Sequence, residues 1–234
     1  MCGRYAIVLD AAQVAAQFGA QLEGSMPPNF NAAPAQNLPV ITNEDPGRVQ
    51  FFRWGLLPDW AKEENAGYKM INARMEGITE KPSFKKAIRQ QRCLVLSNSF
   101  YEWRTQGKLK IPFSIRPTDQ ELFAFAGIWN RWVNRETGEE IPTFAIITME
   151  ANPFMRQLHD RMPAVLPQDQ AHRWIDPKVR FEDAFALLQP YSPARMRAAE
   201  VSRDVNRVGN NGPQLVQPTG EVLEPLGAEA AGGA

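Results

Sequence analysis

Apolar residues along this chain fall into short runs or alternate with polar ones, a pattern typical of β-strands joined by turns. The pattern predicts strands at 4–9, 49–55, 93–96, 100–103, 111–115, 122–129 and 143–149. The segment 134–138, Asn-Arg-Glu-Thr-Gly, separates the last two runs and favours a hairpin connection. The simplest assembly of these runs is a mostly antiparallel β core.

Helical signals are fewer and lie between the strands. Asp10 is a typical N-cap residue for a helix that ends near Phe18. Phe84 and Ile88, four residues apart behind Pro82, predict a short amphipathic helix. Further helices are predicted at 153–158, 168–175 and 181–188. Residues 23–39 contain four prolines, so we expect an ordered loop there.

Strands that do not alternate regularly with helices favour an α+β fold over repeated βαβ units. We therefore predict an α+β single domain with a mostly antiparallel, barrel-like β core and flanking short helices. A length of 234 residues is enough for one substantial core. The domain is expected to span residues 2–217. The last stretch, 218–234, is rich in Gly, Ala and Glu and is predicted to be a disordered tail.

Composition excludes several classes of protein. No apolar run approaches the roughly 20 residues of a membrane span, and the N-terminus lacks a leader pattern, so we expect a cytoplasmic protein without membrane contact. The two cysteines, Cys2 and Cys93, are too few for a disulfide framework, and we expect both thiols to be free. A zinc site from these cysteines with His159 and His172 lacks any local ligand spacing, so no metal or other cofactor is predicted.

The charge is unevenly distributed although the total is balanced. The chain carries 26 Lys and Arg against 26 Asp and Glu, yet residues 53–116 contain 13 basic and 6 acidic residues. Such a window forms either a solvated surface or a face that binds phosphates. Charge alone does not decide between these interpretations.

Cys2 directly follows Met1, so removal of Met1 would leave an N-terminal cysteine with its amine and thiol on adjacent carbons. Such an aminothiol condenses with an aldehyde to a five-membered thiazolidine. An α-amine titrates near about 7.7–8, so part of it is unprotonated at neutral pH. A nearby positive charge, such as that of Arg4, can activate the thiol. Alternatively, a cysteine at this position has no chemical role.

Two titratable residues are candidate partners for Cys2. Glu102 lies between aromatic residues, where desolvation would raise its pKa toward neutrality. The alternative is an outward-facing glutamate on an alternating strand. His159 precedes Asp160 in a predicted loop and is a candidate proton donor, although a structural hydrogen-bonding role fits equally well.

Six motifs occur in a distinctive order along the chain. They are Met1-Cys2-Gly3-Arg4-Tyr5-Ala6, Phe30-Asn31-Ala32-Ala33-Pro34, Arg53-Trp54-Gly55-Leu56-Leu57-Pro58, Ile71-Asn72-Ala73-Arg74-Met75-Glu76, Phe100-Tyr101-Glu102-Trp103 and His159-Asp160-Arg161-Met162-Pro163. In this order they closely resemble the SRAP (SOS-response-associated peptidase) family, whose bacterial and animal members shield abasic sites in DNA. The resemblance spans residues 2 to about 217.

The resemblance implies a DNA-repair protein that binds single-stranded DNA and joins covalently to the ring-opened aldehyde of an abasic site. Cys2 would be the nucleophile and Asn72 would hold the reacting amine and sugar. Glu102 would move protons during imine formation and ring closure, and His159 would protonate the sugar oxygen. The thiazolidine would protect the strand from cleavage.

The same resemblance gives candidates for DNA contacts. Guanidinium groups bind phosphates without sequence preference, and indole rings stack on bases. The candidates are Arg4, Asn31, Arg74, Arg161, Trp54 and Trp103. Because the resembled family binds DNA, the basic window 53–116 is expected to face DNA.

The sequence leaves two rival functions open. One is a thiol peptidase or hydrolase that uses Cys2 with His159 or Glu102, including removal of its own Met1. The other is a non-covalent single-strand binding module. We expect a monomer, since the sequence has no apolar heptad pattern.

Overall fold

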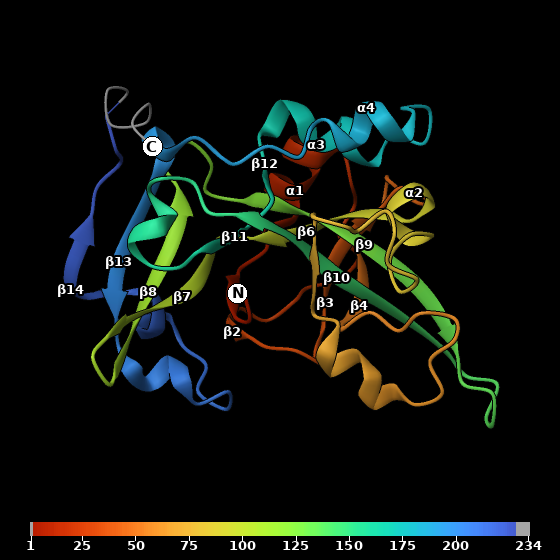
Figure 1. Cartoon of the computed structure of the whole chain (residues 1–234), viewed down its shortest axis with the longest axis horizontal. Helices are drawn as coiled ribbons and strands as arrows, with labels where there is room; N and C mark the ends of the chain where they lie inside the picture. The colour runs from red at the N-terminus through yellow and green to blue at the C-terminus, as the bar shows by residue number, and fades with distance from the viewer. Residues whose placement is uncertain (1, 228–234) are drawn as a thin grey trace.

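The computed structural model describes residues 2–227 and contains two β-sheets with short helices at their edges (Figure 1). The strands are β1 Tyr5–Ile7, β2 Asn29–Ala32, β3 Asn37–Thr42, β4 Gln50–Trp54, β5 Asn72–Arg74, β6 Arg92–Ser97, β7 Ser99–Gln106, β8 Leu109–Pro117, β9 Phe123–Val133, β10 Glu140–Glu150, β11 Arg161–Pro163, β12 Val165–Leu166, β13 Met196–Val201 and β14 Pro218–Leu223. The helices are α1 Ala11–Phe18, α2 Ala87–Gln90, α3 Gln168–Ile175 and α4 Phe181–Phe185. Five 3₁₀ turns complete the described elements: η1 Glu64–Lys69, η2 Met155–Gln157, η3 Pro193–Arg195, η4 Arg203–Asn206 and η5 Pro213–Val216.

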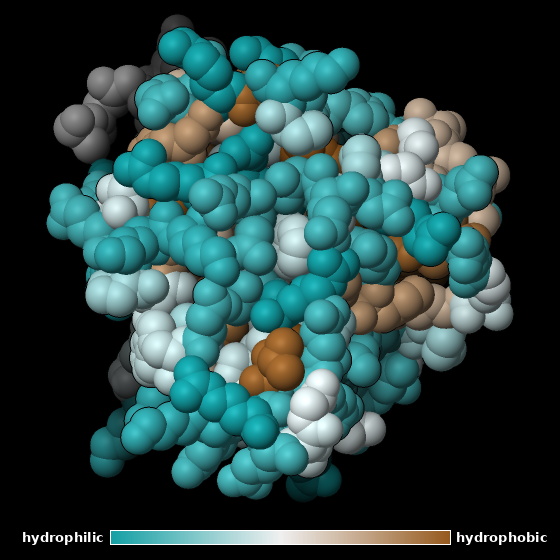
Figure 2. Space-filling view, turned by 90° about the vertical axis from the view of Figure 1, so that its right-hand side faces the viewer, coloured by the Kyte–Doolittle hydropathy of each residue, from teal (hydrophilic) through white to brown (hydrophobic). Residues whose placement is uncertain are grey.

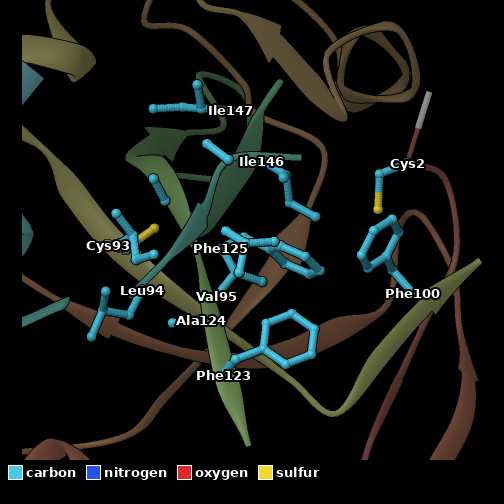
Figure 3. Close-up of a cluster of buried hydrophobic side chains, with 14 of the residues drawn as sticks. Cys2, Cys93, Leu94, Val95, Phe100, Phe123, Ala124, Phe125, Ile146 and Ile147 are labelled. Carbon is cyan, nitrogen blue, oxygen red and sulfur yellow. The ribbon is translucent and has the colours of Figure 1, made fainter. Parts of the chain in front are cut away.

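The larger sheet closes into a barrel. Its strand order is β11-β10-β4-β3-β6-β9-β12, and a further pairing of β9 with β10 closes the ring of β10, β4, β3, β6 and β9. Most pairings are antiparallel, whereas β4 and β5 both run parallel to β10. Fully buried aromatic and aliphatic side chains fill the interior, with Phe125 packed against Phe123 and Phe100 (Figure 3). Apolar burial of this extent is the main stabilising contribution to the fold.

The smaller sheet has the order β14-β13-β8-β7-β1-β2 and lies beside the barrel (Figure 1). Along β7, Phe100 and Glu102 share one face, while Ser99, Tyr101 and Trp103 share the other, because side chains alternate along a strand. Phe100 belongs to the main core, which therefore extends onto the first face. We call the face that carries Phe100 and Glu102 the front of this sheet, and the other face its back.

The predicted fold class is confirmed: the chain is an α+β domain whose mostly antiparallel core includes a closed five-stranded barrel. The Asp10 prediction is also confirmed, since its carboxylate accepts a hydrogen bond from Gln13 N at the start of α1. Three other predicted helices are shorter than expected. Residues 82–88 reach helical geometry only from Ala87, residues 153–158 contain only η2, and the helix predicted at 181–188 ends at Phe185.

Two predicted irregular segments contain strands. Residues 23–39 hold β2 and the start of β3, although prolines are poor strand formers. Strand β3 pairs with β6 only from Val40 onward, so the missing N–H of Pro39 falls outside that pairing. The tail prediction is wrong at 218–223, because β14 pairs with β13 there and Glu221 forms an ion pair with Arg104. Residues 228–234 of the predicted tail lie outside the described residues.

Among residues 2–227, no helix is long and apolar enough to cross a membrane. The face on the right of Figure 1 is mostly hydrophilic, and its apolar side chains form small separate patches (Figure 2).

Candidate active site

Cys2 lies just before β1, where the chain begins between the two sheets (Figure 1). The residue is fully buried, and Figure 3 shows its sulfur directed toward the ring of Phe100. Burial, together with the negative charge of Glu102, raises the pKa of the Cys2 thiol far above its ordinary value. The neutral thiol is therefore the form that this environment favours.

The suggested activation of this thiol by Arg4 is not supported by the structure. The Cys2 sulfur approaches the backbone oxygen of Arg4 at 4.0 Å. The guanidinium turns away and donates to the Asn31 side chain at 2.8 Å and to the backbone oxygen of Val205 at 3.0 Å. The two partners lie 27 and 201 residues further along the chain, so no local sequence pattern could have indicated these contacts.

Glu102 faces inward on β7 and is 2% exposed. Desolvation raises the pKa of its carboxyl, and the nearby positive charge of His159 lowers it in part. The alternative of an outward-facing glutamate is excluded by this burial. A carboxyl with a raised pKa between a thiol and an imidazole is suited to both accepting and donating protons.

Asn72 holds the backbone of Cys2 from the barrel side. Strand β5 places it beside Ile146 of β10, and its Nδ2 donates to the Cys2 backbone oxygen at 2.8 Å. The carboxamide Oδ1 of Asn72 is buried and accepts no hydrogen bond from the described residues. A buried amide oxygen of this kind is suited to receive an N–H group from a ligand or a nearby amine.

His159 follows η2 and precedes β11. Its Nδ1 lies 2.9 Å from Arg161 N, which donates to it, and 2.7 Å from Asp160 Oδ1. When Nδ1 accepts from the backbone, Nε2 carries the proton. In that arrangement the imidazole presents a proton-bearing Nε2.

Two surface hollows meet at His159. One, of about 500 Å³, is lined by Arg4, Glu102, Trp103, Thr105, Lys110, His159 and Asn206. The other, of about 850 Å³, is lined by Arg74, Glu150, Arg156, Leu158, His159, Asp160 and Arg161. Both hollows carry cationic side chains, so a polyanion could pass from one to the other over the imidazole.

The predicted DNA contacts divide into two groups. Arg74 is exposed in the larger hollow, and Trp103 lines the smaller one with its Nε1 donating to Asn206 at 2.8 Å. Arg161 also lines the larger hollow, but both of its terminal nitrogens are bound to the Glu76 carboxylate at 2.8 Å. A phosphate would compete with Glu76 for this guanidinium.

Asn31 and Trp54 are buried rather than on the surface, so their placement gives no support to the DNA contacts predicted for them. Trp54 is 1% exposed, stacks on Phe144 and donates from Nε1 to Ile71 O at 2.9 Å. Asn31 is also 1% exposed, and its Nδ2 contacts three backbone oxygens between residues 205 and 210. Asn31 therefore fixes the segment 205–210 and orients Arg4.

Sequence reasoning missed six residues that line these hollows: Thr105, Lys110, Glu150, Arg156, Leu158 and Asn206. Lys110 is a basic residue inside the basic window, which was a usable signal. The other five residues had no such signal. Cys93 is a free thiol, as expected, and is fully buried in the barrel. In the described part of the chain, no three His, Cys, Asp or Glu side chains lie close enough together to hold a metal ion.

The fold and site define a class: a single α+β domain with a cysteine next to its N-terminus, held by an asparagine and flanked by a buried glutamate and a histidine. The chain belongs to the SOS response associated peptidase (SRAP) family, whose model matches residues 1–208.

Relatives and solved structures agree with this assignment. The chain is 42% identical to the abasic site processing protein YoqW of Bacillus subtilis (strain 168), over 93% of this chain and 99% of that protein. It is 32% identical to the abasic site processing protein HMCES of Xenopus tropicalis, over 81% of this chain and 65% of that protein. A crystal structure of a protein from Bacteroides thetaiotaomicron superposes with a TM-score of 0.85 at 32% identity, covering 93% of this chain and 100% of that one.

Proposed function

We propose that this protein binds single-stranded DNA and forms a covalent thiazolidine crosslink with abasic sites through Cys2. The observation that carries the proposal is the convergence of Cys2, Asn72, Glu102 and His159 from four separate segments of the chain. The names of the relatives, abasic site processing proteins, support the same substrate.

The first step frees the amine. Removal of Met1 leaves the α-amine of Cys2 attached to a backbone that Asn72 already holds by its carbonyl. The Asn72 Oδ1 is then an acceptor for an N–H of this amine. His159 protonates the ring oxygen of the deoxyribose as the furanose opens, which exposes the C1′ aldehyde.

The second step forms the crosslink. The amine adds to C1′, and the carbinolamine loses water to give an imine. The Cys2 thiol then adds to the same carbon, while Glu102 takes the thiol proton and delivers it to the imine nitrogen. One water leaves in total and no redox change occurs. Ring closure removes the imine, whose electron-withdrawing character would otherwise promote elimination of the 3′ phosphate.

The thiol environment supports an amine-first order over a thiol hydrolase. A hydrolase needs a thiolate, whereas burial and Glu102 both raise the pKa of Cys2. A neutral thiol is no obstacle to the crosslink, because the amine attacks first and the thiol is deprotonated only during ring closure. The two cationic hollows beside His159 are the proposed path of the strand.

A denaturing gel tests the proposal. Full-length protein is incubated with a single-stranded oligonucleotide that carries one abasic site, and with a matched intact oligonucleotide. We expect a band that survives denaturation only with the abasic strand. Acetylating the α-amine while leaving the thiol free should abolish the band, and intact mass spectrometry should show that Met1 is absent from the reactive protein. Binding that is lost on denaturation would contradict the proposal.

A further inference from the structure

The back of the six-stranded sheet carries a separate hollow of about 430 Å³, within the range of small-molecule sites. Its floor is made of small residues, Ala6, Ser99, Ser114 and Ala199, on four neighbouring strands. Because these side chains are short, they leave the space above the sheet open. The hollow lies on the opposite face from Glu102 and includes none of the proposed catalytic residues.

Two arginines stand side by side in this hollow. Arg116 of β8 and Arg197 of β13 are directly opposed in register, so their side chains leave the sheet on the same face. Like charges in directly opposed positions destabilise a sheet unless an anion lies near them. Arg197 binds Glu224 at 2.9 Å, whereas Arg116 is exposed and has no hydrogen bond or ion pair within residues 2–227. Glu121 also lines the hollow, but within residues 2–227 it forms no ion pair with either arginine.

Buried polar atoms in the same place lack partners. Ser99 is 5% exposed, and its Oγ has no hydrogen bond to any described residue. The Nε of Arg197 is also buried without a partner in this part of the chain. Buried donors of this kind are uncommon in folded proteins and are satisfied when a ligand supplies an acceptor.

The walls of the hollow are apolar. Val8, Phe30, Val216, Pro218 and Val222 line it, with Val216 packed on the same side as Phe30. The last three of these residues lie beyond residue 208, where the match to the family model ends. An apolar body would therefore lie against these walls while its head group contacts the arginines.

We propose that this hollow binds a small amphiphilic anion, with a carboxylate or phosphate head at Arg116 and Arg197 and an aliphatic body on the floor of Ala6 and Ala199. The Ser99 hydroxyl and the Arg197 Nε donate to the head group. This site is independent of the proposed DNA chemistry.

Calorimetric titration of the full chain tests the site with four probes: octanoate, octyl phosphate, octanol and acetate. Octanoate or octyl phosphate should bind saturably with one site per chain, and the tighter of the two assigns the head group. Octanol, which lacks the charge, and acetate, which lacks the body, should each bind at least about tenfold more weakly. Octanol binding as tightly as octanoate, or no saturation below roughly 10 mM, would overturn the proposal.

Variants localise the binding. Arg116→Gln removes an exposed charge and should weaken octanoate binding about tenfold. Ser114→Leu fills the floor and should abolish it, whereas Arg135→Gln, an exposed arginine in the distant 134–138 hairpin, should leave it unchanged. Methyl resonances of Val216 and Val222 should shift on titration. Unchanged affinity in Arg116→Gln, or shifts confined to other residues, would disprove the assignment.

Discussion

Two regions of the molecule differ in how completely their buried polar groups are hydrogen-bonded. Around Asn130, away from Cys2, the carboxamide Nδ2 donates to Leu57 O at 2.7 Å and to Asp59 Oδ1 at 2.9 Å, and its Oδ1 accepts from Gln91. Nearby, Arg92 donates to four backbone oxygens, among them Trp174 O at 2.6 Å. Gln91 Oε1 is the exception in this region, since it has no partner among the described residues.

The region that joins the barrel to the six-stranded sheet is different. Asn72 Oδ1 and Thr148 Oγ1 of the barrel and Tyr5 Oη of β1 are buried without a hydrogen bond from the described residues, and Glu102 of β7 is buried beside a thiol. Buried polar groups that are fully bonded stabilise a fold, whereas those left open usually belong to a functional site. The comparison separates the part of the molecule that maintains the structure from the part that is available for chemistry.

The largest expected effect is a difference in adduct yield between variants of the two buried cysteines. Cys2→Ala should eliminate the denaturation-resistant DNA adduct, because it removes the sulfur that closes the thiazolidine. Cys93→Ala should retain the adduct and lower the free energy of unfolding by about 1–2 kcal/mol, since its sulfur packs against Gly127 in the barrel. The denaturing gel measures the adduct yield, and denaturant melts measure the free energy of unfolding. Equal adduct yields from the two variants would show that the site is misassigned.

The next largest expected effect is on the rate of adduct formation, from substitution of Glu102. Glu102→Gln keeps the shape of the side chain but cannot take the thiol proton, so the rate of adduct formation should fall by about 10²–10⁴. In the parent protein the rate should fall as pH drops through the raised pKa of Glu102, above its ordinary 4.5, because the protonated carboxyl is no longer a base. The rate should also fall as pH drops through the pKa of the α-amine, about 7.7–8, because the protonated amine is not a nucleophile. Single-turnover rates against pH should show only the amine step in the variant.

The same substitution should stabilise the fold at neutral pH. The raised folded-state pKa means that the unfolded chain releases the Glu102 proton at a lower pH than the folded chain does. Stability is therefore lost as pH rises from the ordinary value to the raised one, and glutamine avoids this loss. A melting temperature about 2–4 °C higher at pH 7 is expected. A lower melting temperature would mean that the ionised carboxylate stabilises the site instead.

The site shows where sequence reasoning succeeds and fails. Alternation along 100–103 located Glu102 on a strand, but the side that it faces depends on Phe100 packing into the barrel. The burial of Asn31 and the direction of Arg4 depend on backbone oxygens near residue 205, which no nearby residue encodes. Strand β14 is mostly exposed and polar, so its pairing with β13 overrides a composition typical of disorder.

Stability measurements test the hydrogen-bonded region around Asn130 and Arg92. Arg92→Met should lower the free energy of unfolding by about 3 kcal/mol, because it leaves several buried carbonyl groups without donors. The adduct rate per folded molecule should stay unchanged. Asn72→Ala should destabilise by about 1 kcal/mol or less, since only one of its hydrogen bonds is present, while slowing adduct formation. Chemical denaturation and single-turnover assays on both variants distinguish these outcomes. A larger loss of stability for Asn72→Ala than for Arg92→Met would contradict the assignment of Asn72 to the site and of Arg92 to the structural region.

The smallest effect concerns Arg161, whose guanidinium is held by Glu76 at the edge of the larger hollow. The Arg161 guanidinium holds the pKa of the Glu76 carboxyl below its usual range, so the ion pair persists at neutral pH and a DNA phosphate must displace Glu76. Glu76→Gln removes this competition and should tighten binding to single-stranded DNA about threefold. The slope of log affinity against log salt should steepen by about 0.7, the amount expected for one additional phosphate contact on a single strand. Fluorescence anisotropy across a salt series measures both quantities, with Glu136→Gln in the 134–138 hairpin as a matched control for the loss of one negative charge. Equal gains from both variants would mean that general electrostatics, rather than release of Arg161, controls the affinity.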